Sequence, residues 1–269
     1  MEKIGIIGCG WLGQPLAAAL VEQGFTVVGS VTTDEKKAKL AAQGVQAVRL
    51  KLTPAPEGEL AALLAADALV ISVPPRAGAF GDAFHPQQIR HLTDAIRQTR
   101  RSPYVIYVSS TSVYPENNRE AVEADVVTVQ QAAAPALVEA EQLVLALGNA
   151  SVVRCGGLMG YDRRPGKYVA GKKDIPTGAV PVNYIHRDDA AGILRALLAQ
   201  PQPGEVFNAV APRHPTRAEV YRESCQRFGY EQPTFAEPAA PVPFKIVDAG
   251  KVGRVLGYQF RHPDPLTFP

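Results

Sequence analysis

The 269-residue sequence has few cysteines, and the ones it has are isolated. Cys9, Cys155 and Cys225 are far apart, odd in number and form no C-x-x-C pair. Such a set supplies neither a disulfide framework nor a zinc site. We therefore expect no metal, and a reducing cytoplasm is the expected compartment.

Long apolar runs and an excess of one charge are also missing. The most apolar stretch, Leu60 to Val73, carries Asp67 and is too short to span a bilayer, and the first residues do not resemble a signal peptide. Lys and Arg number 28 against 26 Asp and Glu, a net charge of +2. This balance gives no electrostatic case for nucleic acid or an anionic membrane, so neither is expected as a partner.

The sequence does contain a regular alternation of short β-branched runs and longer Ala/Leu-rich runs. Continuously apolar runs such as 68–73 and 104–108 are typical of strands covered on both faces, as in parallel sheets. Strands and helices in alternation indicate right-handed crossovers. The fold predicted is a Rossmann-type, doubly wound parallel α/β sheet. Strands are expected at 4–7, 25–28, 45–52, 68–73, 104–108, 151–153 and 206–208, and helices at 15–23, 34–43, 57–66, 86–99, 135–147, 188–198 and 216–229.

Two segments interrupt the alternation. Residues 156–181 are rich in Gly, Pro and basic side chains, and residues 231–244 are rich in proline. Both follow strands, where open α/β sheets place substrate-binding insertions. We therefore expect a dinucleotide-binding core of residues 1–156, rejoined by 184–207. Residues 157–183 and 208–269 are expected to form a small, discontinuous substrate lobe.

The first predicted strand leads into a G-x-G-x-x-G motif. In this motif the first glycine permits a tight turn, the second lets a pyrophosphate approach the backbone, and the third lets the helix pack closely on the strand. The helix that follows offers free N–H groups and a partial positive charge. The motif's place between a strand and a helix indicates a dinucleotide site rather than an empty glycine turn. Its members are Gly8, Cys9, Gly10, Trp11, Leu12 and Gly13.

The second predicted strand bears on which dinucleotide binds. NAD sites usually carry an acid about 20 residues after the motif, bonded to the ribose 2′-OH. Here no carboxylate occurs before Asp34, which favours NADP over NAD. The lysines behind it are either 2′-phosphate ligands or a solvated helix face. The side chains available to a 2′-phosphate are Ser30, Thr32, Thr33, Lys36 and Lys37.

Several motifs together resemble an extended short-chain dehydrogenase/reductase. They are the Gly-x-Gly-Trp-Leu-Gly turn, the strand that ends in Pro74-Pro75, the run from Val108 to Tyr114, and the run from Asn183 to Asp189. The sequence is most similar to an atypical bacterial branch with this turn, described as NAD-dependent epimerase/dehydratase-like. The resemblance implies hydride chemistry with NAD(P), cofactor contacts at Pro74 and Ser109, and a homodimer.

The sequence departs from this family at the acid–base pair. Active members use Tyr-x-x-x-Lys, and the corresponding positions here are Ala133 and Leu137. Neither side chain can transfer or tune a proton. Ser110 matches the family's Ser/Thr position and is the candidate that orients a substrate oxygen. Tyr114 is either a substitute catalytic group or a packed tyrosine with a satisfied hydroxyl.

A group of basic and aromatic residues lies around the expected substrate lobe. Guanidinium and ammonium groups suit an anionic ligand such as a nucleotide sugar, although the same charges could simply be solvated in an exposed loop. A histidine before an Asp-Asp helix start is either a ligand or a structural residue of that helix. The substrate-binding candidates are Arg154, Arg163, Lys167, Tyr168 and His186.

Two functions are consistent with these observations. The first is an NAD(P)-binding, epimerase/dehydratase-like oxidoreductase with a small-molecule substrate and a non-standard active site. The second is a non-catalytic protein that senses NAD(P)(H). The basic lobe favours the first, and the missing Tyr/Lys pair favours the second.

Overall fold

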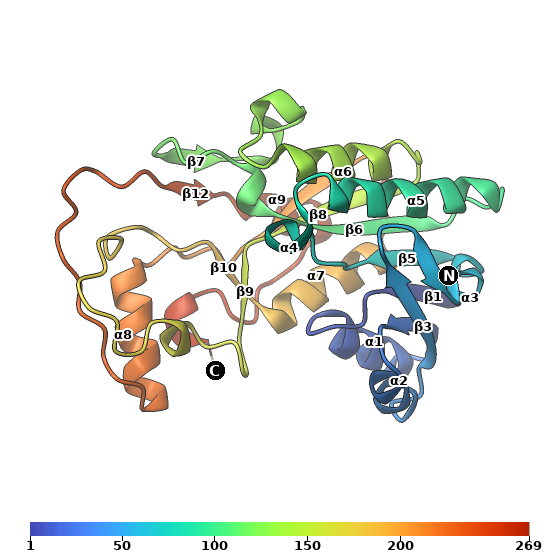
Figure 1. Ribbon diagram of the computed structural model, residues 1–269, viewed down its shortest axis with the longest axis horizontal. Coiled ribbons are helices and arrows are strands. Elements are labelled where there is room, and N and C mark those ends of the chain that lie inside the picture. Colours follow the sequence, from blue (N-terminus) through green and yellow to red (C-terminus); the bar gives the residue numbers. More distant parts are fainter. Residues whose placement is uncertain (269) are drawn as a thin grey trace.

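A computed structural model describes residues 1–268 and has an eight-stranded sheet at its centre. The strand order is β11-β8-β6-β5-β1-β2-β3-β4 (Figure 1). Every pairing is parallel except that of β4 with β3. The chain starts in the middle at β1, winds outward to β4, and then returns through β5 to the other side. The predicted doubly wound parallel sheet is therefore confirmed.

The elements follow one another in strict alternation through most of the chain. The sheet strands are β1 (Lys3–Ile7), β2 (Thr26–Val31), β3 (Gln46–Leu52), β4 (Pro56–Gly58), β5 (Ala68–Ile71), β6 (Tyr104–Ser110), β8 (Ala150–Cys155) and β11 (Val206–Ala209). The helices are α1 (Gly13–Glu22), α2 (Asp34–Ala41), α3 (Leu60–Leu64), α4 (Ala77–Phe80), α5 (Phe84–Gln98), α6 (Pro135–Leu145), α7 (Arg187–Ala199), α8 (Arg217–Phe228) and α9 (Gly250–Leu256).

Helices cover both faces of the sheet, which is why its strands are apolar throughout. Helices α5 and α6 pack side by side on one face, and α1 and α7 lie on the other (Figure 1). The predicted apolar face of α5 is buried at Ile89, Leu92 and Ile96. Continuous burial along β5, β6 and β8 leaves only the strand ends for polar chemistry.

The helix predicted over 57–66 is only partly present. Residues 56–58 instead form β4, an antiparallel strand on the edge of β3, and α3 begins at Leu60. Gly58 has a φ of +121°, and a Cβ there would lie 2.3 Å from the carbonyl oxygen of Arg49. Because the backbones approach so closely at Gly58, β4 ends there and α3 begins only at Leu60.

Two small parallel sheets lie outside the main one. Strand β9 (Gly157–Met159) pairs with β10 (Tyr184–His186), and β7 (Arg119–Ala121) pairs with β12 (Lys245–Val247). Helix α8 stands apart from the main sheet, packed on residues 165–168 (Figure 1). Within residues 1–268, no helix is both long and apolar enough to cross a membrane.

A buried ion pair lies between the sheet and α6. Arg154 on β8 and Glu141 on α6 are almost fully buried, with 2.7 Å between Arg154 Nη2 and Glu141 Oε2. The rest of the guanidinium donates to the Tyr114 hydroxyl and to the carbonyl oxygens of Glu123 and Val126. Every N–H of Arg154 thus has an acceptor, which makes a buried charge tolerable.

Removing one partner of this pair should destabilise the fold more than removing both. Arg154→Met leaves Glu141 as an unpaired buried carboxylate, and we expect it to cost about 3–5 kcal/mol in the free energy of unfolding. The double variant Arg154→Met/Glu141→Leu should lose clearly less than the sum of the two single variants, because no charge is stranded. Urea unfolding of the three variants measures this.

The matched control is Lys39→Ala, which breaks the exposed ion pair with Glu35 on α2. It should leave stability nearly unchanged, because both groups stay hydrated. Strict additivity of the two buried substitutions would contradict the proposed coupling.

Candidate functional site

The G-x-G-x-x-G turn joins β1 to α1 at the carboxyl edge of the sheet. Gly8 has a φ of +101°, and a Cβ there would lie 2.4 Å from the carbonyl oxygen of Ser72. A Cβ on Gly13 would lie 2.4 Å from the carbonyl oxygen of Gly8. A Cβ on Gly10 would meet no protein atom within 4 Å. Two glycines are therefore required by the fold, whereas Gly10 faces open space.

Strand β2 supports this turn from the side. The amide of Gly8 donates to the hydroxyl of Ser30 over 2.9 Å, and the amide of Cys9 donates to the carbonyl of Ser30 over 2.8 Å. Within residues 1–268, the amides of Trp11, Leu12 and Gly13 donate to no protein atom. Free amides at the start of a ten-residue helix suit a phosphate group.

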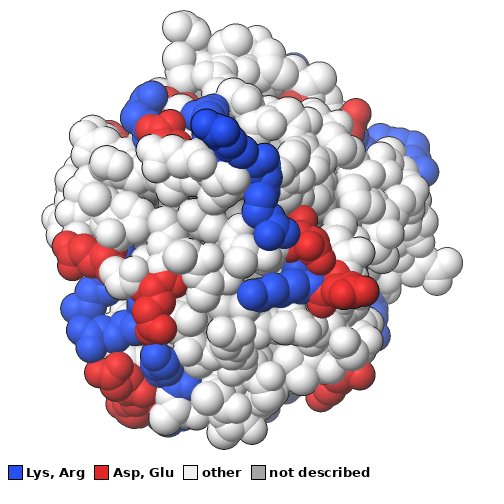
Figure 2. Space-filling view, turned by 90° about the vertical axis from the view of Figure 1, so that its right-hand side faces the viewer, with Lys and Arg blue, Asp and Glu red and all other residues white. Residues whose placement is uncertain are grey.

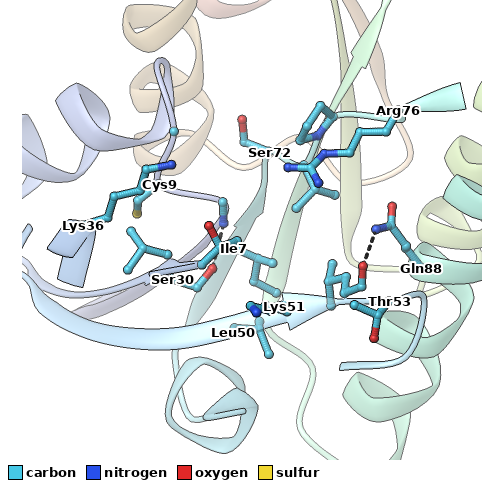
Figure 3. A pocket seen from close by; sticks show the side chains of 17 residues that line it. Ile7, Cys9, Ser30, Lys36, Leu50, Lys51, Thr53, Ser72, Arg76 and Gln88 are labelled. Carbon is cyan, nitrogen blue, oxygen red and sulfur yellow. Dashed lines mark hydrogen bonds between the residues drawn. The ribbon is translucent and has the colours of Figure 1, made fainter. Parts of the chain in front are cut away.

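A cleft of about 450 Å³ opens over the turn, at the carboxyl ends of β1, β2, β3 and β5 (Figure 3). This is the edge where open α/β sheets bind their ligands. Among the expected cofactor residues, Gly8, Gly10, Ser30, Thr32 and Pro74 line the cleft. The hydroxyl of Thr33 instead accepts the Lys36 amide as the N-cap of α2.

The charged side chains that line the cleft are all cationic. They are Lys36, Lys51 and Arg76; no Asp or Glu is among the lining residues. In Figure 3, Lys36 and Arg76 extend into the cleft from opposite sides. Arg76 directly follows the Pro-Pro stop after β5, and Lys51 lies at the end of β3. Sequence reasoning missed both, although their positions after strands were visible signals.

The nearby carboxylates already have other partners. Glu59 pairs with Lys37 at 2.8 Å, Asp34 with Arg49 at 3.0 Å and Glu35 with Lys39 at 2.7 Å. On the face seen in Figure 2, basic and acidic side chains are accordingly interspersed. These pairings leave the positive charge at the cleft uncompensated by Asp34 and Glu35 of α2 or by Glu59, which precedes α3.

Trp11 extends from the phosphate turn toward the segment after β9. Its indole N–H donates to Asp162 over 2.6 Å, and the Arg163 and Arg187 guanidinium carbons lie 4.2 and 5.0 Å from the ring centroid. Arg163, expected to bind substrate, thus lies against the phosphate turn. This cation–π contact directly joins the G-x-G-x-x-G turn to the segment that follows β9.

Three other expected site residues belong to the buried network. All the N–H groups of Arg154 are used within the protein, so none is left for a substrate. The Ser109 hydroxyl donates to Glu141 rather than into the cleft. The Tyr114 hydroxyl donates to Asn208 over 2.7 Å, and burial raises its pKa to about 12. Tyr114 therefore has the packed position, not that of an exposed base.

Ser110 lies at a second cavity, of about 250 Å³, farther along the carboxyl edge. Its hydroxyl accepts the amide N–H of Ser112 over 3.1 Å and keeps its own proton for another acceptor. Sequence reasoning missed the charged and phenolic residues around it, since they are distant in the chain. Those residues are Glu116, Tyr184, Arg217, Tyr221 and Lys245.

The remaining substrate-binding candidates lie elsewhere. Lys167 and Tyr168 are exposed and line neither cavity. His186 is fully buried at the start of α7, where its Nδ1 accepts the Asp188 amide over 3.3 Å. It has the geometry of a helix cap, the structural alternative for this residue.

His186, Asp188 and His262 bring three metal-ligand atoms within 4.8 Å of one another. The carboxylate of Asp188 already accepts the Tyr161 hydroxyl, at 2.9 Å, and His186 Nδ1 is engaged as the cap. Two of the candidate ligand groups are thus already engaged at the helix terminus, whereas His186 Nε2 is buried and accepts or donates no hydrogen bond within residues 1–268. Burial, together with nearby His262, lowers the pKa of His186 to about 4.

Comparisons with known proteins place the chain in a nucleotide-binding family. Residues 8–201 match the model of a family described as NAD(P)H-binding. Protein YeeZ of Escherichia coli (strain K12) is 35% identical over 274 residues, covering 100% of this chain and 99% of that protein.

Two solved structures show the same fold. A conserved protein of unknown function from Silicibacter pomeroyi has a TM-score of 0.80 at 24% identity, covering 100% of this chain and 96% of that one. The UDP-glucuronic acid 4-epimerase of Bacillus cereus, solved with UDP-glucuronic acid and NAD, has a TM-score of 0.76 at 17% identity. That match covers 98% of this chain and 95% of the epimerase.

The neutral His186 should make stability depend on pH. Its folded pKa of about 4 lies below the unfolded value of 6.5, so the unfolded chain takes up the proton first as the pH falls. Between pH 7 and pH 5, the free energy of unfolding should drop by about 1–2 kcal/mol through this group. His186→Asn, which keeps a capping side chain, should reduce the drop.

Urea unfolding at pH 7 and pH 5 measures this difference, with His91→Asn as the control on the exposed side of α5. An equal pH dependence in wild type and His186→Asn would show that His186 is not the group involved.

Proposed function

The chain belongs to the NAD(P)H-binding family, and from this premise we propose that it is an NADP(H)-dependent oxidoreductase with an epimerase-like architecture. The observation that carries the proposal is the open face of Gly10 beneath a cleft lined by cations and no acid. A dinucleotide phosphate fits this chemistry at both ends: free amides at the turn, and ammonium or guanidinium groups at the rim.

The preference for NADP rests on the end of β2. An NAD site there would offer a carboxylate to the ribose 2′-OH, and this cleft offers Thr32 with Lys36 instead. A 2′-phosphate would add about two negative charges, for which Lys36, Lys51 and Arg76 are the available partners. NAD has no 2′-phosphate, so with NAD bound these cations would lack that negatively charged partner.

When bound, NADP(H) would supply or accept a hydride. The chain's part is to bind the cofactor, to hold a substrate at the adjacent cavity, and to orient a substrate oxygen through the Ser110 hydroxyl. Ala133 and Leu137 occupy the family's acid–base positions, so proton transfer needs another group at the second cavity.

A second candidate is a protein that senses NADP(H) without turnover. Its support is the absence of the Tyr/Lys pair at 133 and 137. Both candidates require the cofactor, and they differ in the use of Ser110. Turnover that Ser110→Ala abolishes would favour the enzyme.

Substitution of Gly10 should separate binding from folding. Gly10→Ala places a methyl group in the open space beside the turn, where it would block the phosphate's approach to the backbone without a clash in the fold. We expect NADPH affinity to fall at least about tenfold, equal to about 1.4 kcal/mol, with an unchanged melting temperature. Energy transfer from Trp11, the only tryptophan, to bound NADPH measures affinity.

Gly13→Ala is the contrasting variant, because its Cβ would collide with the backbone of Gly8. It should lower the melting temperature as well. Unchanged NADPH affinity in a folded Gly10→Ala protein would contradict the placement of the pyrophosphate.

The preference for NADP should depend on the lysines at the rim. Lys36→Ala/Lys51→Ala should weaken NADPH binding about tenfold or more and leave NADH binding within about twofold, because only NADPH carries the 2′-phosphate. Lys37→Ala is the control: Lys37 pairs with Glu59 and does not line the cleft. Tighter binding of NADH than NADPH by the wild type would overturn the preference.

A further inference from the structure

The second cavity is built from four separate parts of the chain. Its walls are residues 110–116, 180–184, 217–221 and 244–245. The amide of Arg217 donates to the carbonyl of Val180 over 2.8 Å, which docks the start of α8 on the 180–184 segment. The Asn183 side chain bonds the backbone of Lys245 and Val247, at 2.9 and 2.8 Å. These contacts within the chain hold the walls of the cavity together.

Two cations face this cavity. Lys245 is half-buried, and its ammonium donates to the carbonyl oxygen of Tyr114 over 2.6 Å; its other two N–H groups have no acceptor among residues 1–268. Burial lowers the pKa of this amine, and the nearby Glu116 opposes the shift. Arg217 is also half-buried and has no carboxylate within 4.0 Å among residues 1–268. Two cations thus stand against one carboxylate.

The cavity is also small. Pockets that enclose drug-sized ligands measure roughly 300–1,000 Å³, and this one measures about 250 Å³. Tyr184, Tyr221 and Phe244 narrow it with aromatic rings. A nucleoside diphosphate sugar is larger than a drug-sized molecule, so this space could enclose only a small part of it.

We infer that this cavity binds a small oxyanion-bearing substrate, a carboxylate or a phosphomonoester, through Arg217 and Lys245, and not a nucleotide sugar. That the bound molecule is a substrate rests on the proposed function; that the cavity binds an oxyanion does not. Ser110 lies at the end of β6, the strand next to β5, and would then contact the part of the molecule nearest the cofactor cleft.

Binding of two simple anions tests the site. Acetate stands for a carboxylate and inorganic phosphate for a phosphomonoester, each titrated by calorimetry into the protein with and without NADPH. We expect one of the two to bind, and Arg217→Gln and Lys245→Met each to weaken that binding about tenfold or more. Arg222→Gln, which removes an exposed charge from the same helix, should change it less than about twofold. The anion that binds tighter identifies the class.

Other outcomes would overturn the inference. They are no binding of either anion, equal binding in Arg217→Gln and wild type, or binding of UDP-glucose that is lost in the same two variants. Because Lys245 also bonds the Tyr114 carbonyl, Arg217→Gln is the deciding variant if Lys245→Met unfolds. Failure of NADPH to bind would contradict the proposed function alone, since the anions are also measured without it.

Discussion

The buried pair of Arg154 and Glu141 is the interaction on which the site's geometry depends. It joins β8 to α6, and through Tyr114 and Ser109 it also fixes the end of β6 and the turn that follows. A buried charge cannot replace its protein hydrogen-bond partners with water, so the residues of this network can shift only together. Ser110 is consequently held at the cavity by groups that line neither the cleft nor the cavity.

Local sequence signals were sufficient for the sheet and for the phosphate turn. Gly8 and Gly13 are required by backbone contacts within the turn itself, and apolar strands indicate burial on both faces wherever they occur. The short hairpin formed by β3 and β4 was harder to predict from the sequence, because the composition of Glu57 to Ala66 favours a helix. There the unpaired edge of β3 outweighed local propensity.

The substrate side could not be predicted in the same way. Arg154 has the same basic character in the sequence as Arg163 and Lys167, yet β8 lies inside the sheet and takes its arginine into the core. Conversely, Lys245 and Arg217 reach the cavity only because β12 pairs with β7 and α8 docks on residues 178–182. Such long-range pairing leaves no periodic pattern in the sequence.

The β4 edge of the sheet also bears on the tendency of the protein to aggregate. An open parallel sheet ends in a row of unpaired backbone groups that can recruit a foreign strand. Here the outermost strand has only three residues, begins with a proline that lacks an N–H, and ends at a glycine with positive φ. The sheet therefore terminates itself at this edge, which protects the concentrated protein against strand-by-strand aggregation.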